Sequence, residues 1–489
     1  MRSRRFIAGL ALLAGLAQTG AQAQTPGPAL KPCRIEGVPT ELQCGLLKRP
    51  LDPQQPQGRQ IEIHYMVVPA MARNKQPDPV TLLAGGPGQS AIHIAPLVLP
   101  RLGRLNNRRD LIFIDQRGTG RSAPLECPDD TRLPLDQALD PAAQLKRLDA
   151  CRQALEQLPH GDLRFYTTEI AMQDIDAVRR QLGVARWNVL GGSYGTRAAL
   201  DYQRQFPQAV RRLVIDGVAP PDMALPAAFS TDGQAALEAM FAACEAEAAC
   251  RQRFPALRTD WEALLASLPR PVELLHPLSG EPQRFTLTRA MLLRGTRLPM
   301  YSPALAAALP AAIHQAARGR LEALMGLAGA MGGGGRAGKL AAGMHFSVIC
   351  AEDLPRLATA ADAPGRDFGR VDAEFYQAVC KTWPQGAVSP DFYSIKPAAA
   401  PVLVLSGGAD PVTPPRHGER IAALLGPQAV HAVVPQAGHG VMALPCMREL
   451  IHRFIDTRED AAALKGVDAS CASKIPRPGA YLPIEGTQP

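Results

Sequence analysis

The sequence predicts an α/β protein with a mostly parallel, doubly wound sheet and an inserted, mainly helical lid. Short apolar runs typical of buried parallel strands recur along the chain. Amphipathic stretches lie between several of these runs, and the alternation stops between about residues 220 and 396. The chain has 489 residues, 46% hydrophobic and 20% charged, which is ample for a large core. Its mean hydropathy of -0.07 excludes a polytopic membrane protein.

The expected strands are compact and mostly apolar. Residues 61–68 alternate in their first half, as an antiparallel edge strand would. The other expected strands are residues 80–83, 111–114, 187–190, 213–215, 402–405 and 430–434. Helical spacing of apolar residues predicts helices over residues 169–182, 196–205, 417–425 and 447–455.

The region from 220 to 396 is rich in Ala and Leu, and prolines separate its expected helices. It contains a four-glycine run in Met331–Arg336, which we interpret as a flexible loop because no Lys-Ser/Thr follows it. We therefore expect a first core segment over 24–219, a helical lid insertion over 220–396, and a second core segment over 397–489.

The N-terminus has the features of a signal peptide over residues 1–23. Arg2, Arg4 and Arg5 precede an apolar run over 6–17, and Ala21-Gln22-Ala23 is a small-residue cleavage site. The run is too short to span a bilayer comfortably, although an uncleaved anchor is the alternative. We expect a periplasmic or secreted chain beginning at Gln24, without stable membrane insertion. Export by the general or the twin-arginine route stays open.

Cysteine usage agrees with export, because the ten cysteines fall into five neighbouring couples and none forms a C-x-x-C pair, which disfavours zinc. We expect sequential disulfides, although the sequence does not prove connectivity. The expected pairs are Cys33–Cys44, Cys127–Cys151, Cys244–Cys250, Cys350–Cys380 and Cys446–Cys471.

The strongest chemical signal is Gly191-Gly192-Ser193-Tyr194-Gly195, between an expected strand and an expected helix. This context is what the G-x-S-x-G nucleophile elbow requires. The turn is so tight that small residues are needed two before and two after the serine. Ser193 is therefore the candidate nucleophile.

A serine hydroxyl needs a base, and in this fold class the order along the chain is Ser, acid, His. His439 follows the strand 430–434, and Asp410 follows the strand 402–405. We predict that His439 takes the proton and that Asp410 orients it. Asp216, which also ends a strand, is the competing acid. The competing histidines, His417 and His431, fall on a helix start and within a strand.

The glycine-rich segment 84–90 follows the strand 80–83. Acyl transfer passes through an oxyanion that backbone N–H groups stabilise, and such enzymes place their second donor in this loop. We assign the N–H groups of Gly86 and Tyr194 as the donors. The glycine-rich loop 115–122 is interpreted as structural support for this segment rather than as a nucleotide site.

Together these motifs resemble the α/β-hydrolase branch of prolyl aminopeptidases and secreted tripeptidyl aminopeptidases. They are G-G-P-G, D-Q-R-G-x-G-x-S, G-G-S-Y-G-T-R, G-G-x-D-P-V-T-P and G-H-G, between about residues 35 and 475. The resemblance implies an α/β-hydrolase fold, the triad Ser193, Asp410 and His439, cleavage near a free N-terminus, and no cofactor. Ala84 and Tyr194 depart from the prolyl branch, where His and Trp are usual, and favour the larger tripeptidyl branch.

In that family, acidic residues of the lid bind the substrate ammonium. Glu352 and Asp353 are the candidates here, next to Cys350. A solvated acidic turn is the equal alternative.

The sequence thus predicts an exported serine exopeptidase acting on short peptides or peptide N-termini. A carboxylesterase with the same triad is one alternative, and a non-catalytic binding protein is another. The formal charge of +8 is scattered rather than clustered, so we expect no nucleic-acid partner. We also expect no metal and a monomer.

Overall fold

The computed structural model describes residues 30–128, 133–276, 279–332 and 338–483. The expected signal peptide, residues 1–23, and most of the four-glycine run lie outside these ranges. Within these ranges no helix combines the length and the apolar character that crossing a bilayer requires.

The described residues form a nine-stranded sheet in the order β1-β2-β3-β5-β4-β6-β7-β10-β11. Its strands are β1 (Lys31–Cys33), β2 (Leu42–Pro50), β3 (Gln60–Val68), β4 (Val80–Leu83), β5 (Leu111–Ile114), β6 (Trp187–Gly192), β7 (Val210–Asp216), β10 (Val402–Gly407) and β11 (Ala429–Val434). From β5 to β11 all neighbours are parallel, whereas β1, β2 and β3 add an antiparallel extension. The mostly parallel sheet predicted from the sequence is therefore confirmed.

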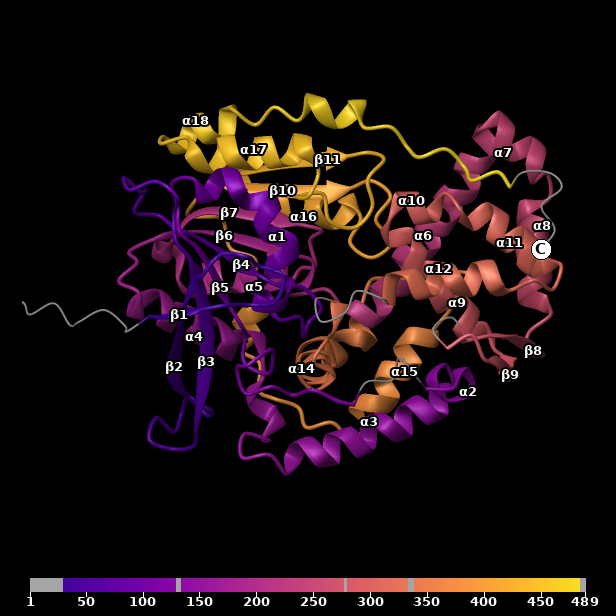
Figure 1. Cartoon of the computed structure of the whole chain (residues 1–489), viewed down its shortest axis with the longest axis horizontal. Helices are drawn as coiled ribbons and strands as arrows, with labels where there is room; N and C mark the ends of the chain where they lie inside the picture. Colours follow the sequence, from indigo (N-terminus) through magenta and orange to yellow (C-terminus); the bar gives the residue numbers. More distant parts are fainter. Residues whose placement is uncertain (1–29, 129–132, 277–278, 333–337, 484–489) are drawn as a thin grey trace, which may run out of the picture.

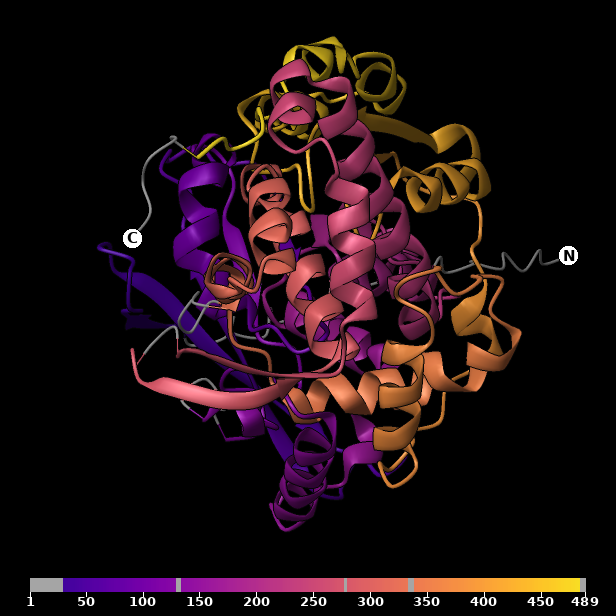
Figure 2. The same cartoon turned by 90° about the vertical axis from the view of Figure 1, so that its right-hand side faces the viewer.

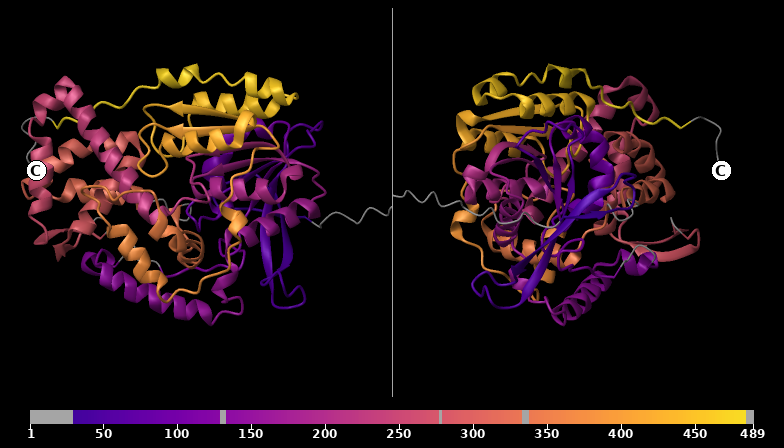
Figure 3. Two further views of the ribbon diagram at one scale, coloured as in Figure 1. Left: turned by 180° about the vertical axis from the view of Figure 1, so that it is seen from behind. Right: turned by 60° about the vertical axis from the view of Figure 1, so that its left-hand side comes forward.

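Helices cover both faces of this sheet (Figures 1 and 3). Helices α1 (Ala91–Asn106) and α17 (Pro445–Asp456) pack on one face. Helices α4 (Thr168–Gln181), α5 (Tyr194–Gln205) and α16 (Pro415–Leu425) pack on the other.

Strand β10 shows how one strand contributes to both cores. Val402 and Val404 belong to one hydrophobic cluster, and Leu403 and Leu405 to the other. Successive side chains of a strand point to opposite faces, so a continuous apolar run is what a doubly covered strand needs.

The helical region has a hydrophobic core of its own, which includes the buried side chains of Leu237, Phe241 and Trp261. Its helices are α6 (Leu225–Ala246), α7 (Ala248–Arg253), α8 (Leu257–Ala266), α9 (Arg289–Arg297), α10 (Pro303–Ala306), α11 (Leu309–Ala317), α12 (Glu322–Gly332), α14 (Ala342–Val348) and α15 (Val371–Cys380). A hairpin of β8 (Arg270–Leu275) and β9 (Pro282–Leu287) also lies here, which the sequence patterns did not indicate.

Two further features differ from the sequence-based expectation. Strand β3 is not an edge strand, because β2 pairs along its outer side. Helices α2 (Leu135–Ala138) and α3 (Pro141–Glu156) precede residue 220 but pack against the helical region, α2 on β9 and α3 on α15.

The parallel strands point toward the helical region, as the arrows of β10 and β11 show in Figure 1. Figure 2 looks onto the helical region and shows its helices in front of the sheet. The carboxyl edge of the sheet, where the candidate catalytic residues lie, is thus covered by this region.

All five disulfides pair as predicted. Cys446–Cys471 joins α17 to the C-terminal tail, which then runs across to the helical region (Figure 1). There the N–H of Tyr481 donates to the carbonyl of Ala307 at 2.8 Å. The tail therefore links the second core segment to the helices above the sheet.

Candidate active site

Ser193 lies in the turn between β6 and α5, with φ 56° and ψ -125°. A positive φ is rare for a residue with a side chain, and it marks the strained turn of a nucleophile elbow. The flanking positions must be glycine because the neighbouring backbone leaves no room for a side chain. A Cβ on Gly191 would lie 2.4 Å from the carbonyl oxygen of Gly195, and a Cβ on Gly195 would lie 2.1 Å from that of Leu83.

The loops after β10 and β11 bring Asp410 and His439 together. Nδ1 of His439 lies 2.8 Å from Oδ2 of Asp410. Thr413 donates its Oγ1 hydroxyl to the same oxygen at 2.7 Å. The N–H groups of Val412 and Thr413 donate to the other carboxylate oxygen, at 2.9 and 3.0 Å. The carboxylate is therefore buried and fixed on both oxygens.

Electrostatics favour the charged forms of this pair. Burial alone would raise the pKa of Asp410, but the charge of His439 and the hydrogen bonds from His439 and Thr413 outweigh it and lower that pKa. Burial alone would lower the pKa of His439, but the carboxylate of Asp410 raises it above its ordinary value. An imidazole held in this way is a stronger proton acceptor.

His439 and Ser193 both lie against the carboxyl end of β7. The N–H of Ser193 donates to the carbonyl of Asp216, the last residue of β7, at 2.9 Å. A Cβ on the next residue, Gly217, would lie 3.4 Å from Cε1 of His439. The structure therefore brings the three expected triad residues to one edge of the sheet.

Asp216, the competing acid, has a different partner. Its Oδ2 accepts the N–H of Met442 at 2.7 Å, so it holds the chain just after His439. Burial raises the pKa of Asp216 to about 6. The competing histidines are also engaged elsewhere, His417 with Asp232 at 2.8 Å and His431 with Ser406 at 2.9 Å. Asp410 is the carboxylate that the structure places on His439.

The glycine-rich loop after β4 lies against Ser193. A Cβ on Gly85 would lie 3.3 Å from Cβ of Ser193. Gly86 adopts φ +112° and Gly88 φ +108°, conformations that L side chains rarely adopt. Tyr194 opens helix α5, where N–H groups have no acceptor within the helix. Both expected oxyanion donors are thus on backbone that surrounds the serine.

The loop 115–122 supports this segment, as interpreted from the sequence. The buried carboxylate of Asp115 accepts the hydroxyl of Ser90 and the N–H of Ile92, at the start of α1. It also accepts the N–H of Arg121 at 3.2 Å. Asp115 therefore fixes the point where the glycine-rich loop enters α1.

The helical region contacts the same residues from above. The carbonyl of Tyr301 accepts the N–H of His439 at 2.9 Å, and the two rings meet edge to face with centroids 5.0 Å apart. The N–H of Ala341 donates to the carbonyl of Gly88 at 2.9 Å. Nδ1 of His345 lies 3.0 Å from the carbonyl oxygen of Pro87. The helical region therefore holds both His439 and the glycine-rich loop in place.

Glu352 and Asp353 do not fit the expected binding of a substrate amine. Both side chains are 0% exposed, and both pair with the buried Arg197. The guanidinium of Arg197 donates to both carboxylate oxygens of Asp353, at 2.7 and 2.9 Å. Glu352 accepts the N–H and the hydroxyl of Thr168. Their acceptor sites are already used inside the protein, so an incoming ammonium has no free carboxylate here.

These carboxylates instead support the nucleophile elbow from below. The hydroxyl of Thr168 contacts the hydroxyl of Tyr194 at 2.7 Å, and Gln116 donates to that hydroxyl at 3.0 Å. Burial raises the pKa of Glu352 to about 7, against the opposing charge of Arg197. Sequence reasoning missed Arg197 and Thr168, although Arg197 is part of the quoted G-G-S-Y-G-T-R motif.

Two family models match the chain. The model described as alpha/beta hydrolase fold matches residues 78–297, and the model described as TAP-like protein matches residues 366–471. The first match contains Ser193 and the second contains Asp410 and His439.

Curated relatives agree with these matches. A tripeptidyl aminopeptidase of Streptomyces coelicolor is 30% identical over 225 residues, 42% of this chain and 41% of that protein. The serine protease Hip1 of Mycobacterium tuberculosis is 25% identical over 429 residues, 80% of this chain and 81% of that protein. A proline iminopeptidase of Neisseria meningitidis is 30% identical over 141 residues, 29% of this chain and 32% of that protein.

The match thus spans about two fifths of the length of the tripeptidyl aminopeptidases. The sheet order, the helices on both of its faces and the turn at Ser193 agree with the family match over residues 78–297. These findings agree that the chain has the α/β-hydrolase fold.

Proposed function

We propose that this protein is an exported serine aminopeptidase, which hydrolyses peptide bonds near a free N-terminus. The observation that carries the proposal is the meeting of three loops at the carboxyl edge of the sheet. One presents Ser193 on a strained turn, one presents His439 bonded to Asp410, and one presents the glycine-rich segment.

In the proposed mechanism Oγ of Ser193 attacks the substrate carbonyl while Nε2 of His439 accepts its proton. The oxyanion that forms is stabilised by the N–H groups of Gly86 and Tyr194. The imidazolium then gives its proton to the leaving amine, and an acyl-enzyme remains. Water attacks the acyl-enzyme with His439 again as the base, which frees the acid product and restores Ser193. Asp410 stays ionised and holds His439 in the required tautomer.

The preference for peptides is supported by the relatives, whose names are tripeptidyl aminopeptidase, serine protease and proline iminopeptidase. The covered carboxyl edge adds physical support. Because Tyr301 lies on His439 and Ala341 binds the glycine-rich loop, a long folded substrate would have to displace the lid, whereas a chain end would not.

Export is supported by the signal-like residues 1–23 and by the five disulfides. Disulfides form and persist in oxidising compartments. We therefore propose a periplasmic or extracellular location, with the mature chain beginning at Gln24.

Activity-based labelling tests the nucleophile. A fluorophosphonate probe should label the mature protein and fail to label Ser193→Ala. The matched control is Ser473→Ala, which removes an exposed hydroxyl far along the chain and should label normally. A folded protein that no such probe labels would instead be the non-catalytic binding protein.

Substrate panels test the peptidase assignment. Tripeptide, dipeptide and prolyl p-nitroanilides with free amines are compared with their N-acetylated forms and with p-nitrophenyl esters. We expect acetylation to lower kcat/KM by at least about tenfold, since a hydrogen bond to a charged amine is lost. Rapid ester cleavage with no response to acetylation would identify a carboxylesterase.

A further inference from the structure

A second concentration of polar side chains lies at the amino edge of the sheet, opposite Ser193. Asp78 precedes β4, Arg109 precedes β5, Arg186 precedes β6, and Arg211 lies near the start of β7. Helix α17 ends beside them with Asp456, which pairs with Arg109. Parallel strands align these positions at one end of the sheet, so residues far apart in sequence meet there.

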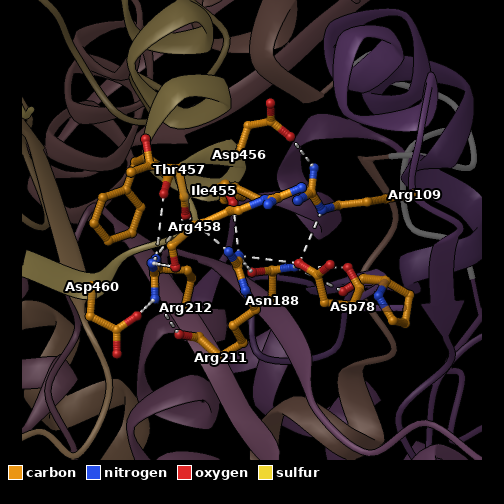
Figure 4. A network of polar contacts seen from close by, with 12 residues as sticks. Asp78, Arg109, Asn188, Arg211, Arg212, Ile455, Asp456, Thr457, Arg458 and Asp460 are labelled. Atoms are coloured by element: carbon orange, nitrogen blue, oxygen red, sulfur yellow. Dashed lines mark hydrogen bonds and ion pairs between the residues drawn. The ribbon is translucent and has the colours of Figure 1, made fainter. Parts of the chain in front are cut away.

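The inner part of this group is a fixed network, shown in Figure 4. Asp78 accepts Nε of Arg109 at 3.1 Å and pairs with Arg211 at 3.1 Å. Arg211 also donates to Oδ1 of Asn188 at 3.1 Å and to the carbonyl of Ile455 at 2.7 Å. These guanidinium groups are therefore held in place before any ligand arrives.

A pocket of about 410 Å³ opens over this network, a size within the usual range for small-ligand sites. Five arginines and two aspartates line it, which leaves three positive charges unmatched. Two of the arginines and both aspartates belong to the fixed network. The remaining three arginines are Arg108, Arg186 and Arg458.

These three rim arginines are exposed, and none of their side chains has a hydrogen bond or ion pair with another residue in the described ranges. Positive charge also affects the inner arginines. Burial lowers the pKa of Arg211, the carboxylate of Asp78 opposes this shift, and the neighbouring charges of Arg212 and Arg109 add to it. Like charges gathered around a cavity attract an anion.

We propose that this pocket binds a terminal phosphate group, either as a free anion or as the phosphate-monoester headgroup of a lipid. Guanidinium groups match phosphate oxygens with paired donors, and several of them can share one phosphate. A carboxylate ligand would bring only one negative charge and two oxygens. A free phosphate or a phosphate monoester brings nearly two negative charges and three oxygens, which better matches the three unpaired arginines.

The first test titrates the mature protein with inorganic pyrophosphate by calorimetry and by thermal unfolding, at constant ionic strength set with sodium chloride. We expect saturable binding and a rising melting temperature. The triple variant Arg108→Gln, Arg186→Gln, Arg458→Gln should bind at least about tenfold more weakly, because each lost charge-assisted hydrogen bond costs about that factor. The matched control, Arg101→Gln, Arg320→Gln, Arg370→Gln, removes three exposed arginines that do not line the pocket and should bind like the wild type.

The second arm separates the two sources of phosphate. Co-sedimentation with vesicles of phosphatidylcholine that contain phosphatidic acid, whose headgroup is a phosphate monoester, is compared with vesicles of phosphatidylcholine alone. Retention on phosphatidic acid that is lost in the triple variant supports a lipid headgroup, and pyrophosphate binding without retention supports a free anion.

The proposal is overturned if the wild type binds neither probe. It is also overturned if the triple variant binds within threefold of the wild type, or if the control variant loses as much affinity as the triple variant. Melting temperatures without any anion verify that both variants are folded, so weak binding is not confused with unfolding.

Discussion

The two edges of the central sheet use polar residues in different ways. At the carboxyl edge, the carboxylate of Asp410 is buried and is held by two backbone N–H groups, one hydroxyl and one imidazole. At the amino edge, the carboxylate of Asp78 meets two guanidinium groups and an amide. At the carboxyl edge Asp410 pairs with one imidazole and no arginine, whereas the amino edge gathers more positive than negative charge.

The two edges differ in charge because their polar residues have different tasks. A proton relay needs a carboxylate whose hydrogen-bond donors, apart from the imidazole, are uncharged groups. A nearby arginine would compete with the imidazole for the negative charge of the carboxylate. The amino edge has no such constraint, and its arginines tie the ends of β6, β7 and α17 together. Removing polar groups should therefore affect chemistry at one edge and stability at the other.

The largest effect on chemistry is expected for Ser193→Ala. Without Oγ no acyl-enzyme forms, and kcat should fall by about a millionfold while the protein stays folded. Steady-state kinetics on the best anilide substrate checks the rate, and circular dichroism checks the fold. A loss of less than about a hundredfold would mean that another group is the nucleophile.

Asp410→Asn should lower kcat by about ten thousandfold, since the amide favours the wrong tautomer of His439. The neutral amide also removes the charge that raises the pKa of His439, so that pKa should fall. The base must be neutral to act, so the acidic limb of the pH profile of kcat/KM should move to lower pH in the variant. A limb that stays in place would show that Asp410 does not set the pKa of His439. Asp216→Asn is the comparison and should shift the limb less, because that carboxylate bonds Met442 rather than the imidazole and its charge raises the pKa of His439 less than that of Asp410 does.

Local patterns were enough to predict the parallel strands and the positions of Ser193, Asp410 and His439. Strand–turn–helix contexts are short-range features, and buried parallel strands are continuous apolar runs. Strand β2 was missed because its sequence, LQCGLLKRP, contains Gly, Lys, Arg and Pro, and only Leu42 at its start is buried. Its pairing with β3 is a long-range contact that no local pattern encodes.

The roles of Glu352 and Asp353 show the same limit within the site. Their acidity and their place beside Cys350 favoured a ligand contact, whereas the structure places them against Arg197, on a helix more than 150 residues earlier. Whether an acidic residue is free to bind a ligand or paired inside the protein depends on its burial. Burial is set by the assembled fold and not by the local sequence. The arginines of the amino edge, scattered in sequence, likewise meet only when the strands align.

At the amino edge, Asp78→Ala should destabilise the protein by about 3 to 5 kcal/mol, since it leaves Arg211 largely buried without a carboxylate and leaves the buried Arg109 with only the partly exposed Asp456. Turnover by Ser193 at the opposite edge should be unchanged at temperatures where the variant is folded. Denaturant unfolding measures the change. Asp456→Ala is the matched control, because its side chain is 42% exposed and its pair with Arg109 should contribute at most about 1 kcal/mol. Equal losses in the two variants would contradict the view that burial of Arg109 and Arg211 makes Asp78 necessary.

The smallest effect is expected for Glu352→Gln, beneath the nucleophile elbow, and it should appear in the pH dependence of stability. Burial raises the pKa of Glu352 to about 7, above its ordinary value of 4.5, so the fold favours the protonated form. The stabilising contribution of that protonation is fully present below pH 4.5 and is lost as the pH rises through 7. Glutamine does not titrate, so between these values the variant should gain on the order of 1 to 3 kcal/mol relative to the wild type. Urea unfolding at pH 4.5, 6 and 7.5 measures this, with the exposed Glu374→Gln as control. If the difference in stability does not change with pH, Glu352 is ionised in the folded protein and Arg197 balances its charge fully.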